Sequence, residues 1–345
     1  MAKPWVKKAK KIAAWAATVL LTGVVILITV TIGWRPVLGA KSRPLTDRQF
    51  ERTPERLARG KYLVNGPAAC FDCHSQVEKE LDKLAPGEAP KFHDLGSGRV
   101  FFDDGKARLV VPNITPDVET GAGTWTDDQF ARAIREGIGH DGRTLFPLMP
   151  YDDFRNLSDE DLASIIVYIR SLPPIRHEMA KSKIPFPLSR LINAAPQPLY
   201  KPVARNTSDK LSRGEYLSKI GHCINCHTPK DKSGKPLPGM QFAGGEQFGP
   251  DVVSANITPD PSGISYYDEQ LFIKVMRTGH VGARPLHSPM PWWFFKNMND
   301  DDLKELFAYL RTVKPIHHRV DNSETATQCK QCNGKHGDGE QNGSL

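Results

Sequence analysis

The sequence predicts an all-α protein in which two tandem domains of similar construction follow one N-terminal transmembrane helix. Three observations predict this fold class: a long uncharged stretch near the N-terminus, an internal repeat in the rest of the 345 residues, and helical periodicity of apolar residues at the end of each copy. Hydrophobic residues make up 39% of the chain, which is enough for two ordinary cores and excludes a disordered or disulfide-dense protein.

The uncharged stretch runs for 23 residues from Ile12 to Trp34 and is long enough to span a bilayer as a helix. Trp15 and Trp34 lie near its ends, where indole rings favour the membrane interface. A cytoplasmic N-terminus is favoured by five preceding lysines, Lys3, Lys7, Lys8, Lys10 and Lys11. The alternative is a cleavable signal peptide, whose apolar region is about 7 to 15 residues long and whose cleavage site needs a small residue at the third position before the cut. Because that residue is absent before Lys41, we expect an uncleaved anchor in the inner membrane, with the rest of the chain in the periplasm.

The basic charge of the chain is confined to this N-terminal region. The formal net charge is +7, but residues 1–43 hold eight cations and no carboxylate, so the remaining residues carry a net charge of −1. The sequence therefore predicts no basic surface for nucleic acid.

Each copy of the repeat contains two cysteines, separated by two residues and followed at once by a histidine. The two pentads are Cys70, Cys73 and His74, and Cys223, Cys226 and His227. This spacing is typical of covalent haem c attachment, because the two thiols reach the vinyl groups of the porphyrin and the histidine lies under the iron. Zinc ribbons pair their halves about 15 to 20 residues apart, whereas these pentads start 153 residues apart. We expect two covalently bound haem c groups, with zinc or paired disulfides as the alternatives.

Similar strings flank both pentads. A short helix is expected before each pentad, over LARGKYL (57–63) and LSRGEYL (211–217), and NITPD recurs after each, at 113–117 and 256–260. About ten additional residues in the first copy are placed in a surface loop within Gln76–Arg99. Capping patterns predict four helix starts: Thr126 with Gln129, Ser265 with Asp268, Ser158 with Asp161, and Asn299 with Asp302. The last two open amphipathic helices with buried stripes at Leu162, Ile165, Ile166 and Ile169, and at Leu303, Leu306, Phe307 and Leu310.

Met149 and Met290 are the predicted sixth ligands of the two haem irons. Each is followed by proline and lies 20 residues after an equivalent glutamine, and a thioether ligand stabilises reduced iron. For the second haem the competing candidates are Met240, Met276, Met298, His280 and His287. His140 and His280 lie at roughly corresponding positions in the two repeats, and each is a candidate hydrogen-bond partner of a haem propionate or of the backbone. Trp292 and Trp293 are expected to cover a haem edge, fill the core or contribute to a contact surface.

These features divide the chain into five parts. The parts are an anchor (1–43), a first domain (44–175), a proline-rich extended linker (176–205), a second domain (206–320) and a tail (321–345). The tail holds Cys329 and Cys332, but Asn333 replaces the proximal histidine. We expect a vestigial or disordered tail whose thiols can form a disulfide, the alternative being a third haem with His336 as its ligand.

Residues 50–320 resemble the membrane-associated cytochrome c subunits of periplasmic alcohol, gluconate and related dehydrogenases. The resemblance is carried by the two pentads, the two NITPD strings, the segment GAGTWTDDQFARAIREGIGHDGRTLFPLMPYDDF and the helix SDEDLASIIVYIRSLPP. It implies class I cytochrome c domains with His/Met-ligated haems, and it departs from the family because those subunits usually carry three haems. The resemblance also implies a dehydrogenase catalytic subunit, or another redox protein, as partner.

We therefore expect an electron carrier that relays single electrons from a dehydrogenase to the respiratory chain and is not itself an enzyme. Electron relay requires no acid, base or nucleophile, so no catalytic residue is expected. Two alternatives remain open at this level: a two-haem subunit of a terminal oxidase and a two-haem peroxidase.

Overall fold

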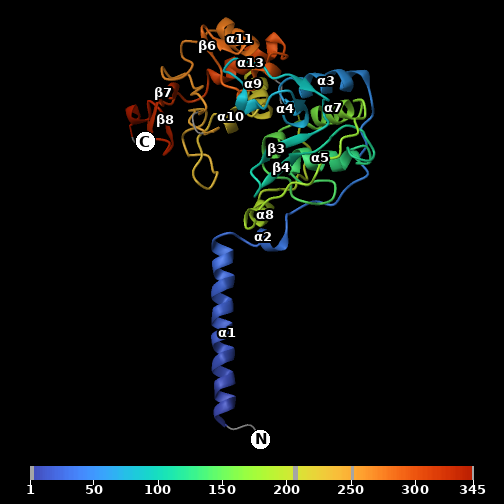
Figure 1. Ribbon diagram of the computed structural model, residues 1–345, viewed down its shortest axis with the longest axis vertical. Coiled ribbons are helices and arrows are strands. Elements are labelled where there is room, and N and C mark those ends of the chain that lie inside the picture. The colour runs from blue at the N-terminus through green and yellow to red at the C-terminus, as the bar shows by residue number, and fades with distance from the viewer. Residues whose placement is uncertain (1–3, 205–208, 250–251, 344–345) are drawn as a thin grey trace.

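A computed structural model of the protein describes residues 4–204, 209–249 and 252–343 (Figure 1). Helix α1 (Pro4–Val30) projects from the remainder as a single rod, and its apolar side chains are exposed. It ends four residues before the predicted limit at Trp34 because Gly33 adopts a φ of +67°, a conformation that glycine tolerates best. Lys3 and the boundary between the linker and the second domain, at residues 205 and 206, lie outside the described residues.

The two copies of the repeat fold into the same series of helices. In the first copy these are α3 (Pro54–Asn65), α4 (Cys70–His74), α5 (Asp127–Glu136), α6 (Tyr151–Phe154) and α7 (Asp159–Ile169). In the second copy they are α9 (Lys210–Ile220), α10 (Cys223–Cys226), α11 (Glu269–Thr278), α12 (Trp292–Phe295) and α13 (Asp300–Leu310). The predicted helix before each pentad is therefore confirmed.

The expectation of an all-α fold is only partly correct, because short antiparallel strand pairs accompany the helices. The pairs are β1 (Gln76–Val77) with β2 (Phe92–His93), β3 (Arg99–Asp103) with β4 (Arg108–Val111), β5 (His280–Val281) with β6 (Arg284–Pro285), and β7 (Asp321–Gln328) with β8 (Lys335–Gly337). The 3₁₀ turns are η1 (Leu81–Lys83), η2 (Ile192–Ala194) and η3 (Gly339–Gln341). The two-residue strands β1, β2, β5 and β6 leave little periodicity in a sequence. The longer strands β3, β4 and β7 were missed as well.

Each copy is built around two crossing helices that meet at a glycine. A Cβ atom at Gly60 of α3 would lie 2.0 Å from the Ser164 carbonyl oxygen of α7, and one at Gly214 of α9 would lie 2.0 Å from the Glu305 carbonyl oxygen of α13. Only a residue without a side chain allows the two backbones this close. The repeated glycine therefore sets the helix crossing in both copies.

Three of the four predicted helix starts are confirmed. Thr126 forms a complete capping box with Gln129, and Ser158 and Asn299 accept hydrogen bonds from the first turns of α7 and α13. The start predicted at Ser265 is wrong, because the Asp268 carboxylate itself caps α11 by accepting from the Leu271 backbone N–H.

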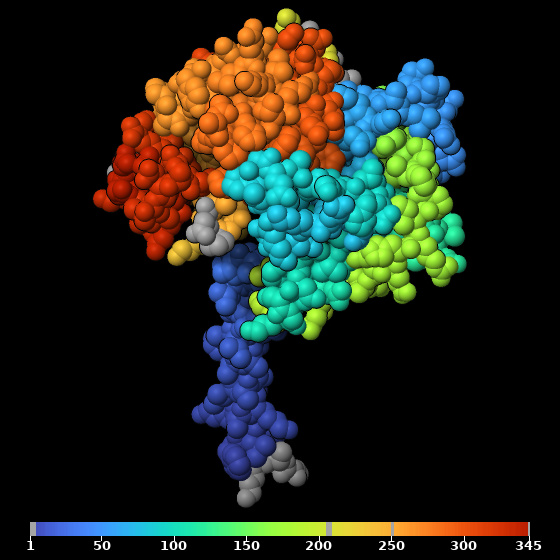
Figure 2. Space-filling view, turned by 45° about the horizontal axis from the view of Figure 1, so that its top comes forward, coloured from blue at the N-terminus to red at the C-terminus, as the bar shows by residue number. Residues whose placement is uncertain are grey.

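The two copies contact each other through two reciprocal hydrogen-bonded groups. The Tyr62 hydroxyl of α3 donates to Asp302 Oδ2 of α13 at 2.5 Å, and the Tyr216 hydroxyl of α9 donates to Asp161 Oδ2 of α7 at 2.6 Å. Asp302 and Asp161 are buried, and Arg213 and Arg59 of their own copies neutralise them. A single hydrophobic cluster runs through both copies, and Figure 2 shows them packed face to face. The two copies thus bury polar and apolar surface against one another.

The linker and the additional loop of the first copy are more structured than expected. The linker contains α8 (Leu188–Leu191), which packs near α2 (Arg35–Leu38) (Figure 1). Lys183 of the linker also pairs with Arg108 of β4. The expectation of an extended linker is therefore only partly correct, because α8 and η2 interrupt it. The loop over 76–99 reaches the second copy, where the Gly87 backbone N–H donates to the Leu286 carbonyl oxygen at 2.8 Å.

The C-terminal tail is folded, which corrects the expectation of a disordered segment. Strands β7 and β8 pair, and Cys329, Cys332 and His336 are buried at 0%, 3% and 2% exposure. These cysteines pack with Met240, Ala243 and Ile316 in a second small core. No pair of the six cysteines, all of which lie in the described part of the chain, forms a disulfide, so the pairing suggested for Cys329 and Cys332 is absent.

Candidate haem sites

The histidine of each pentad is oriented by one backbone carbonyl. His74 Nδ1 lies 2.9 Å from the Pro112 carbonyl oxygen, and His227 Nδ1 lies 2.7 Å from that of Ala255. A carbonyl oxygen can only accept, so Nδ1 carries the proton in both rings and Nε2 keeps its lone pair. Both imidazoles are therefore prepared to bind a metal through Nε2.

The repeated NITPD string holds those two carbonyls in place. Asn113 is buried; its Nδ2 donates to the Ile175 carbonyl oxygen, and its Oδ1 accepts from the backbone N–H and hydroxyl of Thr115. Asn256 makes the same contacts with Ile316 and Thr258. Since Pro112 and Ala255 directly precede these asparagines, the string links the histidine to the chain that follows the last helix of each copy.

Met149 and Met290 lie in two loops of the same backbone geometry. The methionine N–H donates to the third preceding carbonyl, at 3.1 Å for Met149 and 3.0 Å for Met290. The following prolines, Pro150 and Pro291, both have φ −82° and ψ 53°. Both methionines are half-buried and pack against the cluster that also contacts Cys70 and Cys223. Their predicted equivalence is confirmed, and their role as ligands stays a prediction.

The competing candidates for the second site lie in other surroundings. Met298 is 2% exposed within the main core, and Met240 is fully buried beside the tail cysteines. Met276 packs on the main core, and burial lowers the pKa of His287. His280 Nδ1 contacts the Thr278 carbonyl oxygen, whereas its counterpart His140 stacks on Trp125 with ring centroids 4.5 Å apart. Trp292 and Trp293 are buried, so they form part of the core and not of an exposed contact surface.

Burial also keeps the pentad side chains uncharged. It lowers the pKa of His74 to about 4, although the bond to Pro112 acts in the opposite direction, and it lowers the pKa of His227. Burial raises the pKa of the Cys70 and Cys73 thiols to about 12. Both histidines are therefore neutral at pH 7.

Several buried donors near the pentads lack a protein partner, and they test whether haem c fits. The Tyr151 hydroxyl and Trp292 Nε1 each lie two residues after the loop methionine, and both lack a hydrogen-bond partner among the described residues. Arg99 is 5% exposed, and its Nε and Nη1 lack partners as well. Buried donors are normally paired, so these need an acceptor that the described residues do not supply. The two propionates of haem c are such acceptors, and the residues present fit the group.

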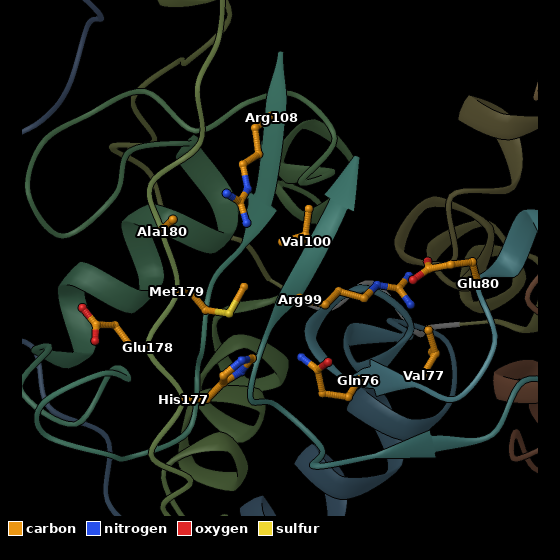
Figure 3. A pocket seen from close by; sticks show the side chains of 10 residues that line it. All are labelled: Gln76, Val77, Glu80, Arg99, Val100, Arg108, His177, Glu178, Met179 and Ala180. Carbon is orange, nitrogen blue, oxygen red and sulfur yellow. The ribbon is translucent and has the colours of Figure 1, made fainter. Parts of the chain in front are cut away.

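A cavity of about 290 Å³ adjoins the first pentad. Figure 3 shows residues of its wall: Arg99 and Arg108 come from β3 and β4, and His177 and Met179 come from the linker. His177 Nδ1 lies 2.9 Å from the Ser97 carbonyl oxygen, which fixes its ring. This cavity could not be predicted from the sequence, because its walls come from segments about 80 residues apart.

Each pentad contacts the loop helix of the other copy. Trp293 Nε1 of α12 donates to Asp72 Oδ1 at 2.9 Å, and burial raises the pKa of Asp72 to about 6 although that hydrogen bond lowers it. In the other direction, Asp153 Oδ2 of α6 lies 2.8 Å from His222 Nδ1 and 3.2 Å from Asn225 Nδ2. Sequence analysis missed these contacts, since a single sequence does not show which copies face each other. They place the two sites on opposite sides of one interface.

Comparisons with known proteins agree with these features. A cytochrome c family model matches residues 57–173. The cytochrome subunit of fructose dehydrogenase from Gluconobacter japonicus is 30% identical over 74% of this chain and 52% of its own length. The gluconate 2-dehydrogenase cytochrome c subunit from Pantoea cypripedii is 29% identical over 74% of this chain and 59% of its own length. A diheme cytochrome c-type protein from Cereibacter sphaeroides is 29% identical over 72% of this chain and 82% of its own length.

The chain spans about half the length of the dehydrogenase cytochrome subunits that it matches. Its pentads, oriented histidines and unpaired buried donors agree with the matched family. Residues 57–173 therefore form a cytochrome c domain, which implies covalently bound haem c, and the chain is homologous to the cytochrome c subunits of fructose, alcohol and gluconate dehydrogenases.

Proposed function

We propose that this protein is a two-haem c-type cytochrome, anchored in the inner membrane by α1, that relays single electrons from a dehydrogenase partner to the respiratory chain. In this proposal each copy is a class I cytochrome c domain in the periplasm. Cys70, Cys73, Cys223 and Cys226 hold the haems, and His74, Met149, His227 and Met290 are the axial ligands. Haem c supplies an iron that gains and loses one electron without making or breaking covalent bonds.

The observation that carries the proposal is the matched construction of the two sites. In both copies a carbonyl held by a buried asparagine orients the histidine, and a methionine loop of identical geometry packs on the same core. The chain thus prepares two similar ligand sets. The two sites lie on one interface, where Asp72 contacts Trp293 and Asp153 contacts His222. This arrangement suits electron transfer between the two haems.

Membrane attachment is supported by the length and exposure of α1. Within Trp5–Val30, an 18-residue window has a mean hydropathy of 2.3, and none of that window is buried in the protein. Twenty or so apolar residues are needed to span a bilayer. The dehydrogenase partner is supported by the names of the relatives, which are cytochrome subunits of fructose, alcohol and gluconate dehydrogenases.

Removal of one proposed methionine ligand tests the sites. The reduced wild-type protein is expected not to bind carbon monoxide, whereas Met149→Ala and Met290→Ala each open one axial position and are expected to bind one equivalent. Met276→Leu is the matched control, since Met276 packs on the core from helix α11, is not one of the proposed ligands, and its variant should behave like wild type. Carbon monoxide binding by the wild-type protein, or peroxide turnover, would contradict the proposal and favour a peroxidase.

Isolation of the tagged full-length chain from its native membrane in mild detergent tests the partner. We expect a dehydrogenase catalytic subunit to copurify, and the substrate of that subunit to reduce the bound haems. Copurification with a copper-containing oxidase subunit would contradict the proposal.

A further inference from the structure

The folded tail brings four metal-binding side chains together on the second copy, and none of the four belongs to a haem pentad. His318, Cys329, Cys332 and His336 are all buried, and their donor atoms lie within 4.8 Å of one another. Cys329 Sγ is 3.5 Å from His318 Nε2, and Cys332 Sγ is 3.4 Å from His336 Nε2. Two thiols and two imidazoles are the donor set of structural zinc sites.

Two of the spacings between these atoms fit one tetrahedral ion. Zinc binds sulfur at about 2.3 Å and imidazole nitrogen at about 2.0 to 2.1 Å, so a tetrahedral angle separates sulfur from nitrogen by about 3.5 Å. The two observed sulfur–nitrogen distances, 3.5 and 3.4 Å, match this value. The six described cysteines are free, so both tail thiols are available as ligands.

Both histidines are oriented as metal ligands are. His318 Nδ1 donates to the Ala243 carbonyl oxygen at 2.8 Å, and His336 Nδ1 donates to that of Gly337 at 2.9 Å. Each Nε2 therefore presents a lone pair to the cluster. In addition, the backbone N–H groups of Cys332 and Gly334 point at the sulfurs of Cys329 and Cys332, at 3.5 and 3.4 Å. Such donors stabilise the negative charge of bound thiolates.

The second copy makes room for the tail at a position where the first copy has a cavity. The Gly98 N–H donates to the His74 carbonyl oxygen and the Gly244 N–H to that of His227, so the next residues, Arg99 and Gly245, are equivalent. Arg99 lines the cavity of Figure 3, whereas a Cβ atom at Gly245 would lie 2.8 Å from His318 and 3.5 Å from Cys332 Sγ.

The histidine beside the cavity of the first copy also corresponds to a histidine of the tail cluster in the second copy. His177 contacts the Ser97 carbonyl oxygen in the first copy as His318 contacts that of Ala243 in the second. The tail cysteines of the second copy thus lie at the position that corresponds to the cavity of the first copy. The arrangement also disfavours a third haem, because Asn333 replaces the proximal histidine and His336 is already directed at Cys332.

We propose that His318, Cys329, Cys332 and His336 bind one structural Zn²⁺ ion that fixes the C-terminal tail to the second copy. Binding deprotonates the two thiols and releases the protons to solvent, with no change in oxidation state. The four protein ligands close the coordination sphere, so the ion has a structural role.

Metal analysis of the purified, haem-loaded full-length protein tests this proposal. We expect one zinc per chain, and zinc K-edge absorption is expected to show two sulfurs at about 2.3 Å and two nitrogens at about 2.0 to 2.1 Å. Cys332→Ser and His336→Asn should each lower the zinc content to background and make the tail sensitive to protease. His317→Asn is the matched control and should retain zinc, since His317 contacts Asp260 and lies outside the cluster. The haem spectra of all variants serve as the measure of folding, because the cluster lies outside both haem sites.

Four results would overturn the proposal. They are a third haem on the peptide that carries Cys329 and Cys332, a disulfide between these two cysteines, reduced thiols that take up no added zinc, and zinc retained by the Cys332→Ser variant. Each is distinguishable by mass spectrometry of the tail peptide together with the metal content.

Discussion

Tyr62→Phe removes one hydroxyl from the interface between the two copies and leaves the ring in place. That hydroxyl donates to Asp302 Oδ2 at 2.5 Å and accepts from the Asn299 backbone N–H at 3.3 Å. A hydrogen bond to a charged group contributes about 1.5 to 3 kcal/mol to stability. Asp302 keeps its partner Arg213 at 2.6 Å, so its carboxylate is not left unpaired. We therefore expect the free energy of unfolding to fall by about 1.5 to 3 kcal/mol.

The reciprocal construction supplies a replicate and a control. Tyr216→Phe removes the equivalent bond to Asp161, at 2.6 Å, and should have an effect of the same size. Tyr168→Phe is the control, because the Tyr168 hydroxyl accepts a longer hydrogen bond from the neutral amide of Asn65, at 3.3 Å and within the first copy. Its effect should stay below about 0.5 kcal/mol.

Guanidinium unfolding of the haem-loaded protein in detergent, followed by Soret absorption, measures these differences. We expect a lower midpoint for both interface variants, with the slope unchanged. If neither interface variant is less stable than Tyr168→Phe, the two copies are not held together by these groups and the reasoning fails.

Three further predictions concern the first copy. Asn113→Ala should destabilise the protein by at least about 2 kcal/mol, because buried backbone groups lose their partners, and the same unfolding assay checks this. Gly60→Ala should cost about 1 to 3 kcal/mol or more, since the added methyl would lie 2.0 Å from the Ser164 carbonyl oxygen; a smaller loss would show that the helices can separate freely. Burial raises the pKa of Asp128, but the hydrogen bonds from Arg43 outweigh it and hold that pKa below its usual value. The stabilisation by Asp128 is therefore complete at neutral pH and is lost as the pH falls below about 4; urea unfolding from pH 7 to 3 should show this loss in wild type, and an equally steep loss in Asp128→Asn would contradict it.

Much of the repeated structure was predictable because short stretches of sequence specify its helix starts and its loops. The caps at Thr126, Ser158 and Asn299 and the paired loops of Met149 and Met290 are specified by short strings, and the structure has them where they were expected. Local patterns fail where two residues compete for one role. At α11 both Ser265 and Asp268 are good caps, and only the path of the preceding turn selects Asp268.

The contacts between distant segments were not predictable from patterns. A half-buried tyrosine such as Tyr62 looks like a core residue in sequence, and its partner lies 240 residues away. The tail was misjudged for the same reason, because a short polar segment that contains two cysteines does not indicate that His318, outside the segment, completes a set of four ligands. Such sites depend on packing, and the packing is visible only in three dimensions.

Peptide mapping of the mature protein by mass spectrometry tests the central claim of two equivalent haem sites most directly. The account predicts one haem on the peptide that carries Cys70 and Cys73 and one on the peptide that carries Cys223 and Cys226. A protein with haem at only one of these pentads, or with neither peptide modified, would contradict it.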